Sequence, residues 1–377
     1  MDWPDLTDRE IALLKLAKPV ARVWLAGAAE GDRQALPVSA SLDALRSSRL
    51  TALTAPVEQG GLGATLAETA VVLECLGRAD ASMALILGMN AQLIGSGRLS
   101  GSRPPAFEGR LHALVVGGGL VNSAASEPGM GSPARGGRPA AIAEPTAGGW
   151  AVTGRKSWVT GAPCLDAVLV SAGVDGATWN FLIELPAVGL SVASDGPKNM
   201  ALRATASSDL VLDRVFVPRE LAVLPRPSMA GGVGWFWTVV AAIYLGVGWA
   251  ALDALADYAG RRVPTALGRP ISTLPKVRQA VGRMALTLSA ARALLRQATL
   301  GAEPPQNDLT LLGAAKTACV EAAITATDLA MRAAGAAALT DRLPLERLFR
   351  DARAGLSNPP AEDVALERLA ARVLGEA

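Results

Sequence analysis

The chain has 377 residues, of which 50% are hydrophobic, so it can bury a large core in two or three domains. Its net charge of +2 at pH 7, without a basic or acidic run, argues against a nucleic-acid partner. His112 is the single histidine, which excludes Ser-His-Asp, Cys-His and multi-histidine metal sites, and we expect no metal. The three cysteines form no CxxC pair, and the polar, acidic N-terminus is not a signal peptide. We therefore expect reduced thiols and a cytoplasmic protein.

The N-terminal third is predicted to be helical. Thr7 begins a Thr-Asp-Arg-Glu capping box, and apolar residues follow it at helical spacing. A glycine-rich break at 56–63 precedes two further buried helices, predicted at 66–76 and 81–94. The run at 98–109 is rich in Gly, Ser and Pro, and we predict a loop there.

From about residue 119 the pattern changes to short runs with a period of two, separated by Gly and Pro. Four of these runs are predicted strands, at 150–153, 167–170, 181–184 and 209–212. Short alternating strands between helical regions predict a small β-barrel or sandwich.

Beyond about residue 228 the chain is again helical, with Ala-rich segments at 236–259, 275–300, 308–334 and 360–374. Four long antiparallel helices with short connections form a bundle. The stretch 228–252 carries no charge and is long enough to cross a bilayer. Because Gly and Ala dominate it and no basic cluster flanks it closely, we predict a buried helix and no membrane span.

The chain is therefore predicted to be an α+β protein of three domains. These are an N-terminal all-α domain at 1–118, a middle β domain at 119–226 and a C-terminal four-helix bundle at 227–377.

The segment 123–160 carries the motifs with the most chemical content. Gly129 and Gly131 let the backbone bend where a Cβ would be strained, so that N–H groups can converge on an anion or a ring oxygen. Trp158 and Thr160 alternate on a β-like run and are predicted to share one face. An aromatic ring beside a hydroxyl group suits a planar cofactor.

This segment resembles the middle domain of the acyl-CoA dehydrogenases. The family pattern is a T/S-E-P-G-x-G-S loop, a G-G-W/Y turn and a K-x-W-I/V-T strand, which match residues 126–132, 148–150 and 156–160. Further resemblances follow in family order at 198–207, 215–218 and 345–353. The resemblance implies the acyl-CoA dehydrogenase fold, a flavoprotein oxidoreductase and FAD as cofactor.

The resemblance also implies which residues hold the flavin ring and its ribityl chain: Ser123, Ala125, Ser126, Gly131, Ser132, Trp158 and Thr160. It places Arg262 at the diphosphate of FAD and Gly335 in the loop around it, often across a subunit boundary, and so implies a homodimer or homotetramer. The family's Gly-Gly-x-Gly loop reads Gly-Ala-Ala-Ala here, at 335–338. FMN, or reduced flavin supplied by a partner reductase, is therefore the alternative cofactor.

The usual catalytic base of the family is missing from both of its positions. A dehydrogenase needs a carboxylate to remove the α-proton of an acyl thioester. Pro359 stands at the commoner position and Phe236 at the other. Glu362 is the candidate for a displaced base. The alternative is that Asn358 caps a helix whose first turn contains this acid.

Three functions remain open at this stage. The first, which we predict, is α,β-dehydrogenation of an acyl thioester or a similar small-molecule substrate, with hydride transfer to flavin N5. The second is a flavin-dependent monooxygenase on the same fold, which needs no base, and the third is a binding homologue without activity. For either enzyme we predict a substrate cleft between the middle domain and the bundle, lined by Trp235, Phe236, Trp237, Ile243 and Tyr244.

Overall fold

The N-terminal helices begin at the residues that the sequence marks. In a computed structural model of the chain, which describes residues 3, 5–100, 103–130, 137–193, 199–225, 231–300 and 308–376, α1 covers Asp8–Gln34. Thr7 caps α1 by accepting a hydrogen bond from the Glu10 N–H, and Glu10 accepts one from Thr7 in return. The second capping box starts α3 (Leu66–Ala79), with Thr65 and Glu68 in the same roles.

The other helices of this region are α2 (Ser39–Ser47), α4 (Ala81–Ser100) and α5 (Pro105–Val116). The predicted loop at 98–109 is wrong, because α4 continues to Ser100 and α5 begins at Pro105. Proline suits the first turn of a helix, where its missing N–H has no helical partner to lose. The two buried helices predicted at 66–76 and 81–94 are confirmed as α3 and α4.

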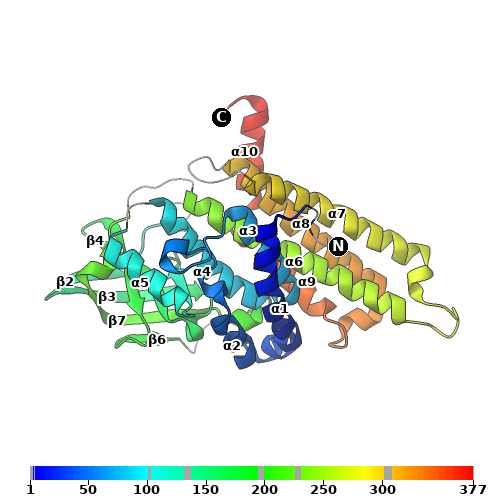
Figure 1. The fold of residues 1–377 in the computed structure, drawn as a ribbon, viewed down its shortest axis with the longest axis horizontal. Helices are drawn as coiled ribbons and strands as arrows, with labels where there is room; N and C mark the ends of the chain where they lie inside the picture. Colours follow the sequence, from blue (N-terminus) through cyan, green and yellow to red (C-terminus); the bar gives the residue numbers. More distant parts are fainter. Residues whose placement is uncertain are drawn as a thin grey trace.

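All four predicted strands lie in one sheet, whose described strands are eight in number. The order is β6-β7-β3-β2-β4-β5-β8, and β1 pairs with β4 in parallel. The strands are β1 (Val121–Ala124), β2 (Ile142–Thr146), β3 (Gly149–Val159), β4 (Ala167–Val174), β5 (Ala177–Glu184), β6 (Leu190–Val192), β7 (Ser208–Pro218) and β8 (Ala222–Val223). Figure 1 shows the sheet at one end of the molecule, with α4 and α5 beside it.

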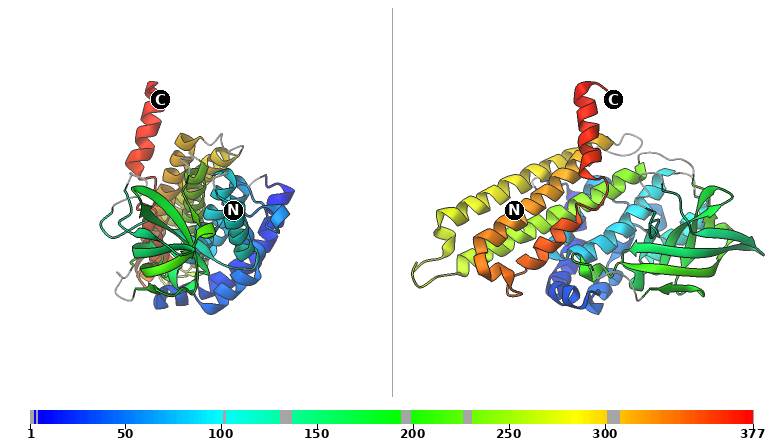
Figure 2. Two further views of the ribbon diagram at one scale, coloured as in Figure 1. Left: turned by 90° about the vertical axis from the view of Figure 1, so that its left-hand side faces the viewer. Right: turned by 180° about the vertical axis from the view of Figure 1, so that it is seen from behind.

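The C-terminal region contains α6 (Gly231–Arg261), α7 (Pro275–Thr299), α8 (Leu309–Ala334), α9 (Leu345–Ala354) and α10 (Glu362–Leu374). The prediction of four long antiparallel helices holds for α6, α7 and α8 only. The short α9 was not among the predicted helices, and α10 projects away from the others (Figures 1 and 2). The order of helices, sheet and helices confirms the predicted fold class.

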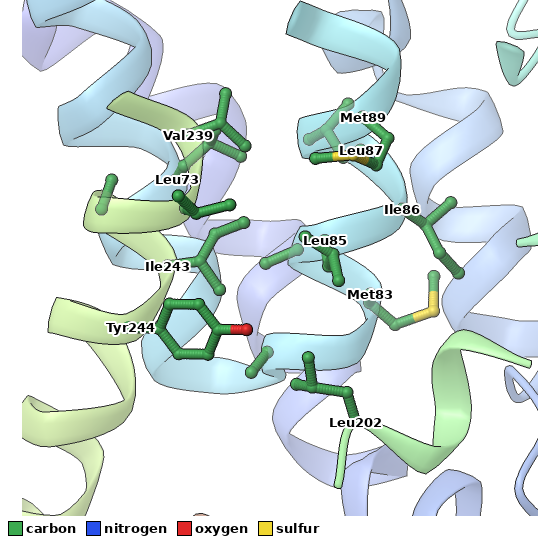
Figure 3. Packing of buried hydrophobic residues seen from close by; sticks show 14 of the residues in the cluster. Leu73, Met83, Leu85, Ile86, Leu87, Met89, Leu202, Val239, Ile243 and Tyr244 are labelled. Carbon is green, nitrogen blue, oxygen red and sulfur yellow. The ribbon is translucent and has the colours of Figure 1, made fainter. Parts of the chain in front are cut away.

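Helix α6 is central to the molecule and packs on α3, α4, α7, α8 and α9. Figure 3 shows its residues Val239 and Ile243 among side chains of α3 and α4. Glycines allow the closest approach, since a Cβ on Gly246 would lie 2.5 Å from the Glu74 carbonyl oxygen, and one on Gly77 2.7 Å from that of Ile243. Among the described helices, α6 and a helix from Leu309 are apolar and long enough to cross a membrane, but 72% of the α6 window is buried.

Candidate active site

The loop that follows β1 is fastened to the end of β3. The Ser157 N–H donates a hydrogen bond to the Ser126 carbonyl oxygen over 2.9 Å. Gly129 has φ +76°, and no atom of the described residues lies within 4 Å of the place where a Cβ would stand, so glycine is needed here for the turn. The loop therefore bends over the edge of the sheet beside β3.

A hollow of about 440 Å³ lies between this loop and the end of β3. We call it the Trp158 hollow, and its lining residues are Ser126, Glu127, Pro128, Gly129, Ser157, Trp158 and Asp209. The indole of Trp158 is 60% exposed, which is unusual for so large an apolar group. The hollow thus combines an aromatic wall with hydroxyl groups and a glycine turn.

The prediction that Trp158 and Thr160 share one face is wrong. The pairing of β3 with β7 shifts register between Lys156 and Val159, and Trp158 there has φ +59°. This bulge breaks the alternation, so Trp158 is exposed whereas Thr160 is only 9% exposed. The Thr160 hydroxyl lies 3.4 Å from that of Ser207, and its carbonyl accepts a hydrogen bond from the Asn122 side chain.

A buried ion pair, which the sequence patterns above do not predict, supports the loop. Lys156 Nζ lies 2.5 Å from Glu127 Oε1, with side-chain exposures of 0% and 4%. Glu127 also accepts hydrogen bonds from the N–H groups of Ala140 and Ala141. Burial lowers the pKa of Lys156, and Glu127 acts in the opposite direction by stabilising the ammonium form. The sequence does contain a signal for this pair. Lys156 lies within an alternating apolar strand, and a buried lysine requires a partner that stabilises its charge.

Three more of the residues predicted for the flavin ring lie in β1 or in the loop that follows it. Ser123, at the end of β1, Ala125 and Ser126 are half-buried. Gly131 and Ser132 lie outside the described residues. The structure thus brings Ser126 and Trp158 into one hollow, while Thr160 lies beside it and is buried.

The predicted substrate-binding residues of α6 lie mainly in the core. Trp235, Trp237, Ile243 and Tyr244 are at most 5% exposed, and Phe236 is half-buried. The Trp235 ring packs against Gly95, and the guanidinium of Arg368 lies 5.3 Å from the ring centre of Trp237. None of the five lines the Trp158 hollow, and their role with substrate stays a prediction.

The segment that carries Pro359 is held by α6 and α8. Lys316 Nζ donates hydrogen bonds to the carbonyl oxygens of Gly355, Asn358 and Pro360, at 2.9, 2.7 and 3.0 Å. Burial lowers the pKa of Lys316 to about 8, although Glu362 and Glu321 oppose this shift.

Asn358 does not cap α10, contrary to the alternative considered for Glu362. The N-cap is Ala361, which makes no side-chain hydrogen bond, and Asn358 instead accepts one from the Tyr244 hydroxyl over 2.6 Å. Glu362 is exposed in the first turn of α10. Its carboxylate is therefore accessible to solvent and close enough to Lys316 to influence that ammonium group.

Arg262 and Gly335 lie far from the Trp158 hollow in the same chain. Arg262 follows the end of α6 and Gly335 the end of α8, at the end of the bundle opposite the sheet (Figure 1). Both residues are exposed. One chain alone therefore cannot bring them to a cofactor held at Trp158.

Comparison with known proteins agrees with this arrangement of helices, sheet and loop. Family models for the N-terminal, middle and C-terminal domains of acyl-CoA dehydrogenases match residues 7–100, 122–215 and 238–357. YdbM of Bacillus subtilis, named as an acyl-CoA dehydrogenase, is 38% identical over 351 residues, which cover 91% of this chain and 92% of YdbM. The chain belongs to the acyl-CoA dehydrogenase family.

Other relatives differ in the reactions that their names give. The 3-sulfinopropanoyl-CoA desulfinase of Paraburkholderia xenovorans is 29% identical over 387 residues, covering 99% of this chain and 97% of that protein. Butyryl-CoA dehydrogenase from Megasphaera elsdenii superposes with a TM-score of 0.87 at 22% identity, covering 99% and 100% of the two chains. The structure of KijD3 with FMN and a dTDP-linked amino sugar gives 0.79 at 25% identity, covering 99% and 95%.

Proposed function

We propose that the chain is a flavin-dependent oxidoreductase that acts on an acyl thioester. The observation that carries this proposal is the Trp158 hollow, in which an indole exposed to 60% meets a glycine turn and the hydroxyl groups of Ser126 and Ser157. These residues fit a flavin, because an apolar wall suits the planar ring and hydroxyl or N–H groups suit its polar edge. FAD is the cofactor typical of the family.

The chain's own residues would hold and orient this cofactor. Trp158 would cover one face of the ring, while Ser126 and the half-buried Ser123 and Ala125 would lie along its polar edge and ribityl chain. The buried pair of Lys156 and Glu127 keeps the loop in place. When bound, the flavin would supply the two-electron acceptor for the oxidation.

A second copy of the chain completes the proposed FAD site. Arg262 and Gly335 are exposed at the far end of the bundle, where the family places contacts to the FAD diphosphate across a subunit boundary. A guanidinium group suits a phosphate, and this assignment implies a homodimer or homotetramer.

Glu362 is our candidate for the group that removes the α-proton. It is an exposed carboxylate beside the segment at 355–360, where Pro359 cannot accept a proton. Dehydrogenation of an acyl thioester requires a group that accepts the α-proton, and a carboxylate oxygen can do so.

A monooxygenase that uses reduced flavin and O₂ is the second candidate. It is favoured by Phe236 and Pro359 at the two positions of the usual base and by the likeness to KijD3, whose structure contains FMN. A catalytically inactive binding homologue is the third.

The test is the absorption spectrum and the extracted cofactor of the purified protein, followed by anaerobic addition of a panel of acyl-CoA thioesters. Yellow protein that contains FAD and bleaches with one acyl-CoA supports the dehydrogenase. Colourless protein that binds reduced flavin and consumes O₂ supports the monooxygenase. Protein without affinity for flavin in any redox state contradicts both.

A further inference from the structure

A pocket of about 830 Å³ lies between α1, α3, α6 and α9, and shares no lining residue with the Trp158 hollow. We propose that this pocket, which we call the α1–α6 pocket, binds a single-chain amphiphile with an anionic head group. Its volume lies within the range of small-molecule sites. Its lining residues are Lys15, Lys18, Pro19, Ala21, Arg22, Leu25, Cys75, Arg78, Ala79, Ala250, Asp253, Ala254, Asp257, Arg261, Arg342, Leu343, Pro344, Arg347 and Leu348.

The packing of three helices creates this space. Helix α3 packs against both α1 and α6, so that α1 and α6 stand as walls on either side of the C-terminal end of α3. The surface between these walls carries small side chains, with Cys75 and Ala79 on α3 and Ala250 and Ala254 on α6. Because these side chains are short, the walls are separated by an apolar space that the protein itself does not fill.

The acidic residues of the pocket are already paired. Asp253 forms an ion pair with Arg78, whose Nη2 lies 2.7 Å from Oδ1, and Asp257 forms one with Arg261. The carboxylates of α6 are therefore neutralised by cations of the same pocket.

Besides Arg347, which is buried, four exposed cations remain on the other side. Lys15, Lys18 and Arg22 recur at successive turns of α1 and face the pocket, and Arg342 approaches it from the segment before α9. Among the described residues, none of these four has a carboxylate within 4.0 Å. Since all four are exposed and line one pocket, they provide a positive rim next to an apolar base. An alkyl chain suits the base, and a carboxylate or phosphate suits the rim.

The first experiment is isothermal titration of the purified protein with decanoate and decyl phosphate below their micelle concentrations. Decyltrimethylammonium and decanol serve as cationic and neutral probes with the same chain. We expect both anions to bind at least about tenfold more tightly than the other two probes, and the tighter anion identifies the preferred head group. Equal affinity for the cationic or the neutral probe contradicts the proposal.

Charge variants on one helix test the rim. Lys18→Ala combined with Arg22→Ala should weaken binding of decyl phosphate by roughly tenfold or more. Arg33→Ala removes positive charge from α1 outside the pocket, where Arg33 pairs with Glu30, and should leave the affinity unchanged. Equal effects of the two changes would mean that only net charge matters, which contradicts a defined site.

Thiol labelling locates the ligand in the unmodified protein. Cys75 lines the pocket, whereas Cys164 is also half-buried but lies elsewhere. Decyl phosphate should slow maleimide labelling of Cys75, read by peptide mass spectrometry, without affecting Cys164. Absence of protection at Cys75 at saturating ligand overturns the proposal.

Ala254→Trp, which fills the base of the pocket, should abolish binding. Retained binding in this variant places the ligand elsewhere and overturns the proposal. The same conclusion holds if Trp158→Ala abolishes binding, because the ligand would then lie in the Trp158 hollow. A change of sedimentation mass in Ala254→Trp, together with no amphiphile binding in the wild type, identifies the pocket as an interface between two copies. Binding to vesicles of phosphatidylcholine and phosphatidylglycerol without binding of monomeric decyl phosphate would show a membrane surface. Both outcomes contradict the proposed site.

Discussion

The ammonium group of Lys156 lies 2.5 Å from the carboxylate of Glu127, and both side chains are buried, with exposed fractions of 0% and 4%. Lys156 comes from β3 and Glu127 from the loop after β1. Glu127 reaches a third segment as well, since its carboxylate accepts hydrogen bonds from the backbone just before β2. One buried pair thus connects the loop after β1 and strand β3, which line the Trp158 hollow, to the segment before β2.

We predict that Glu127→Gln destabilises the protein strongly. The variant leaves the Lys156 ammonium buried without a counter-charge, and breaking a buried pair in this way costs about 3–5 kcal/mol. Urea unfolding measures the change in the free energy of unfolding. The matched control is Glu144→Gln on β2, where the partner Arg214 and Glu144 have side-chain exposures of 66% and 56%. There we expect a loss of at most about 1 kcal/mol. Similar losses in both variants would contradict the role given to burial.

Trp158→Ala should impair flavin retention without unfolding the protein. The indole is 60% exposed, so its removal costs little core packing, but the cofactor loses its aromatic wall. We expect the affinity for flavin, measured by fluorescence quenching, to fall roughly tenfold or more. Trp150→Ala is the control, because Trp150 packs against Trp179 with 5.4 Å between ring centres. It should lower the melting temperature and leave flavin affinity unchanged. If Trp150→Ala lowered the affinity for flavin and Trp158→Ala did not, the cofactor would have to bind outside this hollow.

The sequence predicts local features well where a few neighbouring residues determine them. Thr7 starts α1 with the predicted capping box, a motif that lies within four residues. The alternation at 150–153 and 167–170 likewise locates two strands, because a period of two is a local signal.

Features that depend on distant partners were not predictable in this way. Trp158 departs from the strand pattern because β3 and β7 shift register there, and nothing in the local sequence encodes the partner strand. Asn358 is of a residue type that often caps helices. Its side chain instead accepts a hydrogen bond from the hydroxyl of Tyr244, 114 positions away in the sequence. The α1–α6 pocket combines residues of four helices, and its shape depends on how closely they pack.

Two glycine substitutions should change stability in opposite directions. Alanine is the better helix former, but a Cβ at Gly246 would lie 2.5 Å from the Glu74 carbonyl oxygen, so α3 and α6 would have to separate. We expect Gly246→Ala to lose about 1–3 kcal/mol of unfolding free energy. On α7, no atom in the described part of the chain lies within 4 Å of the place where a Cβ on Gly282 would stand. Gly282→Ala should therefore gain about 0.5–1 kcal/mol. Stability changes of the same sign in the two variants, measured by urea unfolding, would contradict the close contact between α3 and α6.

Asp351 predicts a dependence of stability on pH. Burial raises the pKa of its carboxyl from 3.8 to about 7, with Arg347 opposing the shift. Because the folded pKa is raised, its stabilising contribution is fully present below about pH 4 and is lost as the pH rises through about 7. Between these pH values, the free energy of unfolding of the wild type should therefore fall by a few kcal/mol relative to that of Asp351→Asn. The expected fall is about 1.4 kcal/mol for each unit of pKa difference. Unfolding curves at several pH values test this. Asp213→Asn, at an exposed position, is the control for the substitution itself.

Glu362 provides the sharpest test of the dehydrogenase. If its carboxylate removes the α-proton, Glu362→Gln should lower kcat by about 10²–10⁴ while the acyl-CoA still binds and flavin content is unchanged. Asp363→Asn, one residue further in the same first turn of α10, is the control and should keep most of the activity. Full activity of Glu362→Gln would show that another group accepts the α-proton and would remove Glu362 from the proposed mechanism.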